Sequence, residues 1–271
     1  MTTMINLVRF LILLMRHVLF YTALVAWFLC CLPIFMILLC FPSRCMQRGC
    51  TLFCHSLMAL MAVFLGLRYR VTGTENLPRQ GGYIVASKHQ SAWETVAFLT
   101  FLPNPVFVLK QEMLRVPAVG VILSHLGMIP VSRRSRASKS NSANTSTTNG
   151  TTATTASKST SATHDAFLHQ GKAIIDQHRP VVIFPEGTRT LPGQQIRYHQ
   201  GVIRLAEYTG APIIPLALNS GVFWPRHTFF KKPGIIKVVI LPPLLPDQQD
   251  DIPLLQRLKT SIETASSNLL Q

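Results

Sequence analysis

The sequence has few acidic residues and, beyond residue 54, no cysteine. Of its 271 residues, 11 are Asp or Glu and 26 are Lys or Arg, which gives a formal net charge of +15. All six cysteines lie between Cys30 and Cys54. Their placement argues against a disulfide framework or a cysteine nucleophile in the rest of the chain. The positive charge suits an anionic partner such as lipid headgroups, nucleic acid or an acidic protein.

Several catalytic signatures are missing as well. No G-x-S-x-G sequence of a serine hydrolase occurs, although Ser91 stands close to His89. The segment QGKA at 170–173 lacks the upstream glycine and the hydroxyl of a phosphate-binding P-loop. Without H-E-x-x-H or C-x-x-C, no metal site is predicted. Nucleic-acid binding is not expected, because zinc-ligand spacing, a basic-aromatic RNA motif and a continuous basic helix are absent.

A long apolar run stands near the N-terminus instead. Arg16 and Arg44 bracket 27 residues without a formal charge, which exceeds the roughly 20 that a membrane-spanning helix needs. No small-residue cleavage site follows, so the run differs from a removed signal peptide. A second apolar stretch, between Arg48 and Arg68, is barely long enough to span.

The arginines favour an interfacial arrangement of these two stretches. If both crossed as a hairpin, Arg44 and Arg48 would lie on the side opposite the other arginines, against the positive-inside tendency. Two re-entrant or interfacial helices would keep all of them at one headgroup layer. We therefore expect residues 1–66 to be a membrane anchor with one spanning or two re-entrant helices, and residues 67–271 to be a separate domain.

From residue 67 onward, short β-branched runs alternate with helical patterns. This alternation predicts an α/β fold with a central mixed, largely parallel sheet and flanking helices. Functional sites in such folds form at the carboxyl ends of the strands. Strands are expected at 82–87, 105–110, 180–185 and 212–218, and helices at 94–102, 165–177 and 201–210, the last ended by Gly210.

Residues 135–163 break the alternation. Ser, Thr, Asn and Ala dominate there, with almost no large apolar residue, so burial cannot offset the entropy of ordering. We expect a disordered surface insertion in this segment. Towards the C-terminus, apolar residues at helical spacing predict a helix that packs on the domain: Leu254, Leu258, Ile262, Ala265 and Leu269.

The segment SKHQSAWET, residues 87–95, places His89 five positions before Glu94. Within one helix these side chains would point about 140° apart. They can meet if His89 lies in the loop before the helix and Glu94 in its first turn. One interpretation is a capping box, in which Glu94 reaches back to Ser91. In the other, Glu94 orients His89 as a general base for a hydroxyl.

Other segments favour the catalytic interpretation. VVIFPEGTRT at 181–190 combines a glycine, which lets a ligand approach the backbone, with Arg189, whose planar fork suits phosphate. Four segments resemble, in order, the four motif blocks of the 1-acyl-glycerol-3-phosphate acyltransferase family. They are SKHQSAWET (87–95), GMIPVSR (127–133), VVIFPEGTRT (181–190) and IIPLAL (213–218). The resemblance covers roughly residues 68–245.

The resemblance implies that residues 67–271 form a catalytic domain that acylates lysophosphatidic acid to phosphatidic acid in phospholipid biosynthesis. His89 would take the proton from the free glycerol hydroxyl as it attacks an acyl thioester, with Glu94 in the place of the family aspartate. Lys110 would help stabilise the thioester oxyanion. The phosphate end of the acceptor would be held by Arg133, Glu186, Gly187, Thr188 and Arg189.

The same resemblance implies the partners. The donor would be the thioester of acyl carrier protein or of coenzyme A, used as a co-substrate without a further cofactor. A net charge of +15 suits both an acidic donor and an anionic acceptor. We expect the protein in a membrane rich in its lipid substrates, the inner membrane of a bacterium, with the catalytic domain facing the cytoplasm.

Two departures from the family leave alternatives open. Glu94 replaces the usual aspartate, and Ser132 stands where the family often has Asp or Asn. One alternative is an acyltransferase for another acceptor, such as a lyso-ornithine lipid or glycerol 3-phosphate. The other is a membrane-bound lipid-binding protein that has kept the fold and lost the chemistry.

Overall fold

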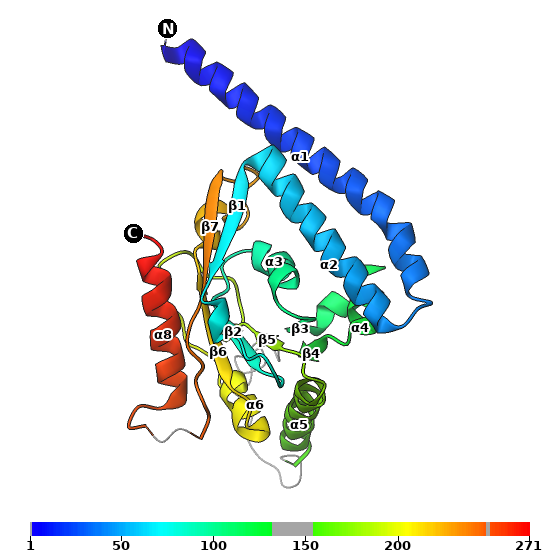
Figure 1. The fold of residues 1–271 in the computed structure, drawn as a ribbon, viewed down its shortest axis with the longest axis vertical. Coiled ribbons are helices and arrows are strands. Elements are labelled where there is room, and N and C mark those ends of the chain that lie inside the picture. The colour runs from blue at the N-terminus through cyan, green and yellow to red at the C-terminus, as the bar shows by residue number, and fades with distance from the viewer. Residues whose placement is uncertain (1, 132–153, 248–249) are drawn as a thin grey trace, which may run out of the picture.

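The computed structural model describes residues 2–131, 154–247 and 250–271. The chain begins with two long helices, α1 (Thr2–Leu38) and α2 (Ser43–Leu60), and a π-helical turn (Met61–Leu65) extends α2. Gly66 then adopts a left-handed φ of 65°, which lets the chain turn directly into the first strand. Figure 1 shows α1 and α2 side by side, reaching beyond the edge of the sheet.

Both N-terminal helices are long and apolar enough to cross a membrane. The candidate segments are Met4–Leu38, with a mean hydropathy of 2.3, and Ser43–Leu65, with a mean hydropathy of 1.5. Only 11% of the most apolar window in the first segment is buried against the rest of the protein. A soluble core helix would be mostly buried, so this exposed apolar surface fits association with a membrane.

Side-chain hydrogen bonds join α1 to a loop of the following domain. The buried ring of His17 accepts a hydrogen bond of 2.8 Å at Nε2 from the Lys231 backbone N–H. The Tyr21 hydroxyl donates to the Phe229 carbonyl at 2.9 Å. α2 packs against α3 (Trp93–Phe101). The apolar helices are therefore fixed in position relative to the sheet.

The domain is built on a seven-stranded sheet with the order β1-β7-β6-β2-β5-β3-β4. All neighbouring strands are parallel except β6 and β7, which are antiparallel. The predicted α/β fold with a mixed, largely parallel sheet is therefore confirmed. The strands are β1 (Leu67–Thr72), β2 (Ile84–Ser87), β3 (Val106–Lys110), β4 (Ile129–Val131), β5 (Val181–Ile183), β6 (Ile213–Leu218) and β7 (Gly234–Ile240).

Helices cover both faces of the central strands, so β2 and β6 are buried along their whole length. Such strands read as continuous apolar runs rather than as alternating patterns. α8 packs on β6 from one side, while α3 and α2 lie on the other (Figure 1). The described part of the domain also contains the 3-10 turns Thr74–Asn76 and Gln111–Arg115. Its helices besides α3 are α4 (Val119–His125), α5 (Thr154–Asp176), α6 (Gly201–Thr209), α7 (Ser220–Phe223) and α8 (Leu254–Asn268).

The structure agrees only in part with the disordered insertion expected at residues 135–163. Residues 135–153 lie outside the described residues, but 154–163 form the first turns of α5 rather than a disordered segment. The part of α5 after residue 165 contains buried Ile174 and Ile175, which fix it on the domain. Once a helix is held in this way, adding residues at its end needs no new nucleation, so a polar Ala-, Ser- and Thr-containing segment can continue it.

Candidate active site

The predicted site residues gather at one edge of the sheet. β2, β5 and β3 are neighbours and run parallel, so their carboxyl ends meet at the same edge. His89 follows β2, Glu186 follows β5, and Lys110 is the last residue of β3. This is the position at which open α/β sheets bind ligands.

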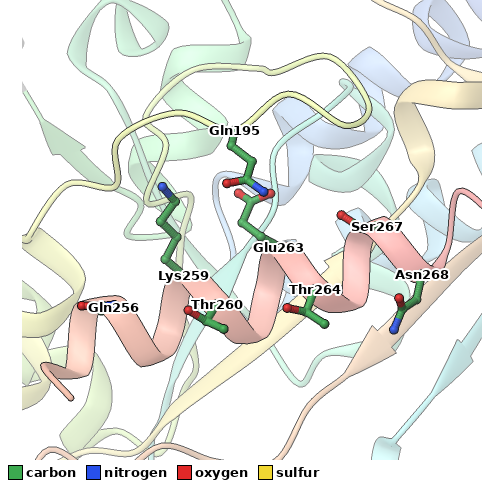
Figure 2. Close-up of a pocket in the computed structure, with 8 residues that line it drawn as sticks. All are labelled: Gln195, Gln256, Lys259, Thr260, Glu263, Thr264, Ser267 and Asn268. Atoms are coloured by element: carbon green, nitrogen blue, oxygen red, sulfur yellow. The ribbon is translucent and has the colours of Figure 1, made fainter. Parts of the chain in front are cut away.

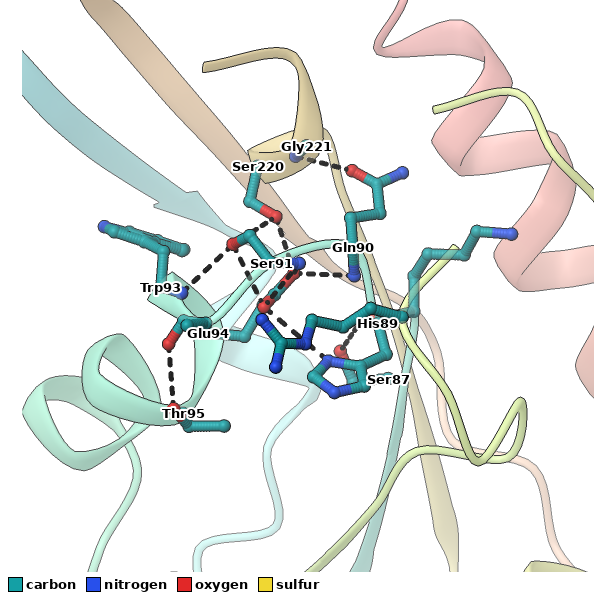
Figure 3. A network of polar contacts seen from close by, with 12 residues as sticks. Ser87, His89, Gln90, Ser91, Trp93, Glu94, Thr95, Ser220 and Gly221 are labelled. Carbon is teal, nitrogen blue, oxygen red and sulfur yellow. Dashed lines mark hydrogen bonds and ion pairs between the residues drawn. The ribbon is translucent and has the colours of Figure 1, made fainter. Parts of the chain in front are cut away.

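Glu94 is fully buried in the first turn of α3 and accepts hydrogen bonds from several donors. The backbone N–H of Gln90 donates to Oε1 at 2.9 Å, and that of Ser91 lies 2.8 and 3.0 Å from the two oxygens. The hydroxyls of Ser91 and Ser220 donate to Oε2 and Oε1 at 3.1 and 2.5 Å. A buried carboxylate needs such partners, and Figure 3 shows them converging on it.

Glu94 also faces His89. Its Oε2 lies 3.7 Å from His89 Nδ1, which is too long for a hydrogen bond but short enough for attraction to a protonated ring. The helix-start contact and the His89 contact thus coexist: Ser91 N–H and His89 Nδ1 face the same carboxylate. With Nδ1 facing Glu94, Nε2 is left for a substrate.

The backbone and ring of His89 are held from three sides. Its N–H donates to Glu186 Oε2 at 2.8 Å, and its carbonyl accepts from the Thr190 N–H at 2.8 Å and the Thr190 hydroxyl at 3.2 Å. The imidazole stacks on Phe184, with ring centroids 4.0 Å apart and an angle of 19° between the planes. The loop after β5 therefore fixes the loop after β2.

Glu186, which was expected to hold the acceptor phosphate, is occupied by contacts within the protein. Its side chain is 0% exposed, and its oxygens bind Lys88 at 2.8 Å, Thr190 at 3.1 Å and the His89 N–H. Burial raises the pKa of Glu186, while the Lys88 ammonium and the other donors oppose that rise. A carboxylate would also repel a phosphate. In this structure the Glu186 carboxylate faces the protein interior, where it contacts the Lys88 ammonium and the His89 backbone N–H.

The rest of the predicted phosphate-binding loop is open to solvent. Gly187 has a φ of 63° and its N–H donates to the Phe184 carbonyl at 2.8 Å, which closes a tight turn. Thr188 and Arg189 are exposed beyond this turn. Lys110 is exposed as well, while Arg133 lies outside the described residues. The structure thus places His89, Glu94, Gly187, Thr188, Arg189 and Lys110 at the same sheet edge.

Three polar residues that the sequence reasoning missed complete the site. Ser220 begins α7, two residues after the end of β6, and contacts Glu94. Lys88 and Glu263 form a buried ion pair of 2.7 Å. Lys88 precedes the candidate base and Ser220 follows the fourth motif block, so their positions were a usable signal. Glu263 carried no such signal, because it is one of several polar residues of a C-terminal helix.

Comparison with known families identifies the family of the chain. The profile of the family described as acyltransferase matches residues 68–219. The chain belongs to the acyltransferase family. This confirms the family predicted from the motif blocks, and the matched range contains the His89 loop, the loop after β5 and the end of β6.

Named relatives within the acyltransferase family are similar over most of this chain. A 1-acyl-sn-glycerol-3-phosphate acyltransferase of Pseudomonas aeruginosa is 34% identical over 189 residues, which is 70% of this chain and 64% of the relative. An enzyme of the same name from Borreliella burgdorferi is 29% identical over 184 residues, 66% of this chain and 62% of that protein. The aligned part thus spans slightly less than two thirds of these relatives.

A solved structure shows the same fold. The crystal structure of the 1-acyl-sn-glycerophosphate acyltransferase of Thermotoga maritima superposes with a TM-score of 0.69, covers 95% of both chains and is 17% identical. The shared fold therefore includes the two N-terminal helices as well as the sheet.

Proposed function

We propose that this protein transfers an acyl chain from an acyl thioester to the free hydroxyl of lysophosphatidic acid, forming phosphatidic acid. The observation that carries the proposal is the His89–Glu94 pair, with Glu94 Oε2 3.7 Å from Nδ1 at the carboxyl edge of the sheet. The names of the relatives in the acyltransferase family support the choice of acceptor.

In this mechanism His89 is the general base. Nε2 takes the proton of the acceptor hydroxyl as the oxygen attacks the thioester carbonyl, and the buried carboxylate of Glu94 stabilises the imidazolium that forms. The tetrahedral oxyanion then collapses, the C–S bond breaks, and the imidazolium returns the proton to the thiolate. Lys110, at the end of β3 and separated from β2 by β5, is the proposed cation for the oxyanion.

The acceptor phosphate would bind to the exposed part of the loop after β5. Arg189 supplies the planar fork, and Gly187 with Thr188 brings the backbone close. Thr190, the next residue, is hydrogen-bonded to the His89 carbonyl at 2.8 Å. A phosphate held at Arg189 would therefore keep a fixed position relative to the base, which is what orientation of a reactant requires. Arg133 is proposed for the same phosphate.

The apolar helices suit lipid substrates. α1 and α2 are joined to the domain through His17, Tyr21 and α3, so an acceptor in the membrane would need little travel to reach the sheet edge. The donor is proposed to be the thioester of acyl carrier protein or coenzyme A. Both donors are acidic and suit the net charge of +15. We place the protein in a bacterial inner membrane, with the domain on the cytoplasmic side where these donors occur.

An acceptor panel tests the proposal. The full chain in membranes receives each donor with lysophosphatidic acid, glycerol 3-phosphate or a lyso-ornithine lipid, and the products are identified by mass spectrometry. The proposal predicts phosphatidic acid as the main product. An acylated product from another acceptor alone would assign a different acceptor, and binding of phosphatidic acid without any turnover would indicate a lipid-binding protein.

A further inference from the structure

A lysine buried beside the candidate base connects three separate parts of the fold. Lys88 is 1% exposed, and its ammonium lies 2.8 Å from Glu186 Oε1 and 2.7 and 2.8 Å from the two oxygens of Glu263. It also donates to the Gln194 carbonyl at 3.0 Å. Its three N–H bonds are thus matched by three acceptor groups, which leaves it little freedom to move.

Glu263 comes from α8, beyond the residues 68–219 that match the acyltransferase profile. It is 6% exposed and also accepts a hydrogen bond of 3.0 Å from the Tyr198 hydroxyl. Figure 2 shows it extending from α8 towards Gln195, in the wall of a hollow of about 550 Å³. An apolar residue would suffice to pack α8 on β6, so this buried acid needs another explanation.

The contacts of Lys88 lead to His89. Glu186 Oε1 forms an ion pair with the Lys88 ammonium at 2.8 Å, and Glu186 Oε2 accepts a hydrogen bond of 2.8 Å from the His89 backbone N–H. We propose that Glu263 is a positioning residue for His89, acting through Lys88 and Glu186, and that α8 is thereby part of the catalytic machinery. This inference rests on the proposed role of His89 as the base.

Charge balance explains how Glu263 would act. Two carboxylates share one ammonium, and each pulls it towards a different element. Without the charge of Glu263, Lys88 moves towards Glu186 and the two form a one-to-one pair, which disturbs the contact of Glu186 with the His89 N–H. A displacement of about 1 Å in a catalytic group can lower the rate by roughly 100-fold. Because the remaining pair is neutral overall, we expect the variant to fold.

The test is Glu263→Gln in the full chain, compared with Glu207→Gln, which removes an exposed acid of α6. We expect kcat to fall roughly 10- to 100-fold in Glu263→Gln, with KM for the acceptor unchanged because Arg189 is untouched, and Glu207→Gln to match the wild type. In a double-mutant cycle, Glu186→Gln and Glu263→Gln should be far from additive, since both act through Lys88. An unchanged kcat in folded Glu263→Gln overturns the inference.

A labelling experiment separates this inference from the acyltransferase proposal. Diethyl pyrocarbonate modifies accessible imidazoles, and the His89 side chain is 16% exposed while His199 is exposed and serves as the internal reference. Glu263→Gln should raise the rate at His89 several-fold relative to His199. If the wild type acylates no acceptor, the acyltransferase proposal is wrong, but the ratio of the His89 to the His199 modification rate still tests the role of Glu263. An unchanged ratio in Glu263→Gln overturns that role. If Glu263→Gln does not fold, Tyr198→Phe, which weakens the hold on Glu263, is compared in the same way.

Discussion

The hydroxyl of Ser220 donates a hydrogen bond of 2.5 Å to Glu94 Oε1, although 126 residues separate the two in the sequence. Ser220 is fully buried at the start of α7, and the same hydroxyl lies 3.1 Å from that of Ser91. The family aspartate is one methylene shorter than Glu94. In this chain the carboxylate of the longer side chain has a donor from the start of α7.

Replacing Ser220 should therefore weaken the orientation of Glu94. In Ser220→Ala, we expect an unfolding free energy lower by about 1.5–3 kcal/mol, the usual contribution of a hydrogen bond to a charged group, and a lower kcat. Thermal melting and acyl-transfer kinetics measure the two effects. Thr95→Ala, which removes an exposed hydroxyl from α3, the helix that carries Glu94, is the matched control. Equal kcat values in the two folded variants would separate Ser220 from the chemistry.

Lys88→Met should destabilise the protein strongly. It leaves the carboxylates of Glu186 and Glu263 buried without their shared cation, and loss of one partner from a buried ion pair typically costs about 3–5 kcal/mol. Lys172→Met is the control, because Lys172 forms an exposed pair with Asp176 at 3.0 Å that should contribute less than about 1 kcal/mol. Tm values in detergent compare the two, and similar values would contradict the role given to Lys88.

Tyr83 should make the stability fall at alkaline pH. Burial raises the pKa of Tyr83 to about 12 from its ordinary value of 10.0, and its hydroxyl has no hydrogen-bond partner among the described residues. Between these values the folded protein retains a proton that the unfolded chain loses. The contribution of Tyr83 to stability is therefore complete below pH 10 and is lost as the pH rises through about 12.

The corresponding experiment is Tyr83→Phe, with melting followed at pH 8 and at pH 11. We expect the variant to lose less stability than the wild type on this change of pH, and to be no less stable at pH 8, because an unsatisfied buried hydroxyl is removed. Tyr208→Phe, at an exposed tyrosine of α6, serves as the comparison. A wild-type pH dependence in Tyr83→Phe would rule out this ionisation as the cause.

Arg189→Ala should raise KM for the acceptor rather than abolish the chemistry. A charge-assisted hydrogen bond contributes about 1.5–3 kcal/mol, equivalent to roughly 10- to 100-fold in binding. The effect should be absent with an acceptor that lacks the phosphate. Arg197→Ala, another exposed arginine of the following loop, should leave KM unchanged. If the two variants behave alike, the phosphate binds elsewhere.

Much of the fold could be predicted because it follows from local patterns. The central strands are continuous apolar runs, and Gly210 ends α6 with a left-handed φ of 70°. Strands β1 and β7, which form one end of the sheet, were not predicted, since Arg68, Arg70 and Lys237 interrupt their apolar pattern. In the site, His89 and Glu94 belong to one short segment and could be paired from it. The contacts of Glu186 with Lys88 and His89 could not be predicted, because the sequence does not show towards which side of its loop Glu186 points. Glu263 meets Lys88 only through the packing of α8.

The central claim is that His89 is the base of an acyl transfer to lysophosphatidic acid. The most direct measurement compares phosphatidic acid formation by wild type, His89→Ala and Glu94→Asp in purified membranes containing equal amounts of folded protein. The account predicts turnover by the wild type, its loss in His89→Ala, and a reduced but measurable rate in Glu94→Asp, which keeps the carboxylate. Turnover in His89→Ala at the wild-type rate would contradict it.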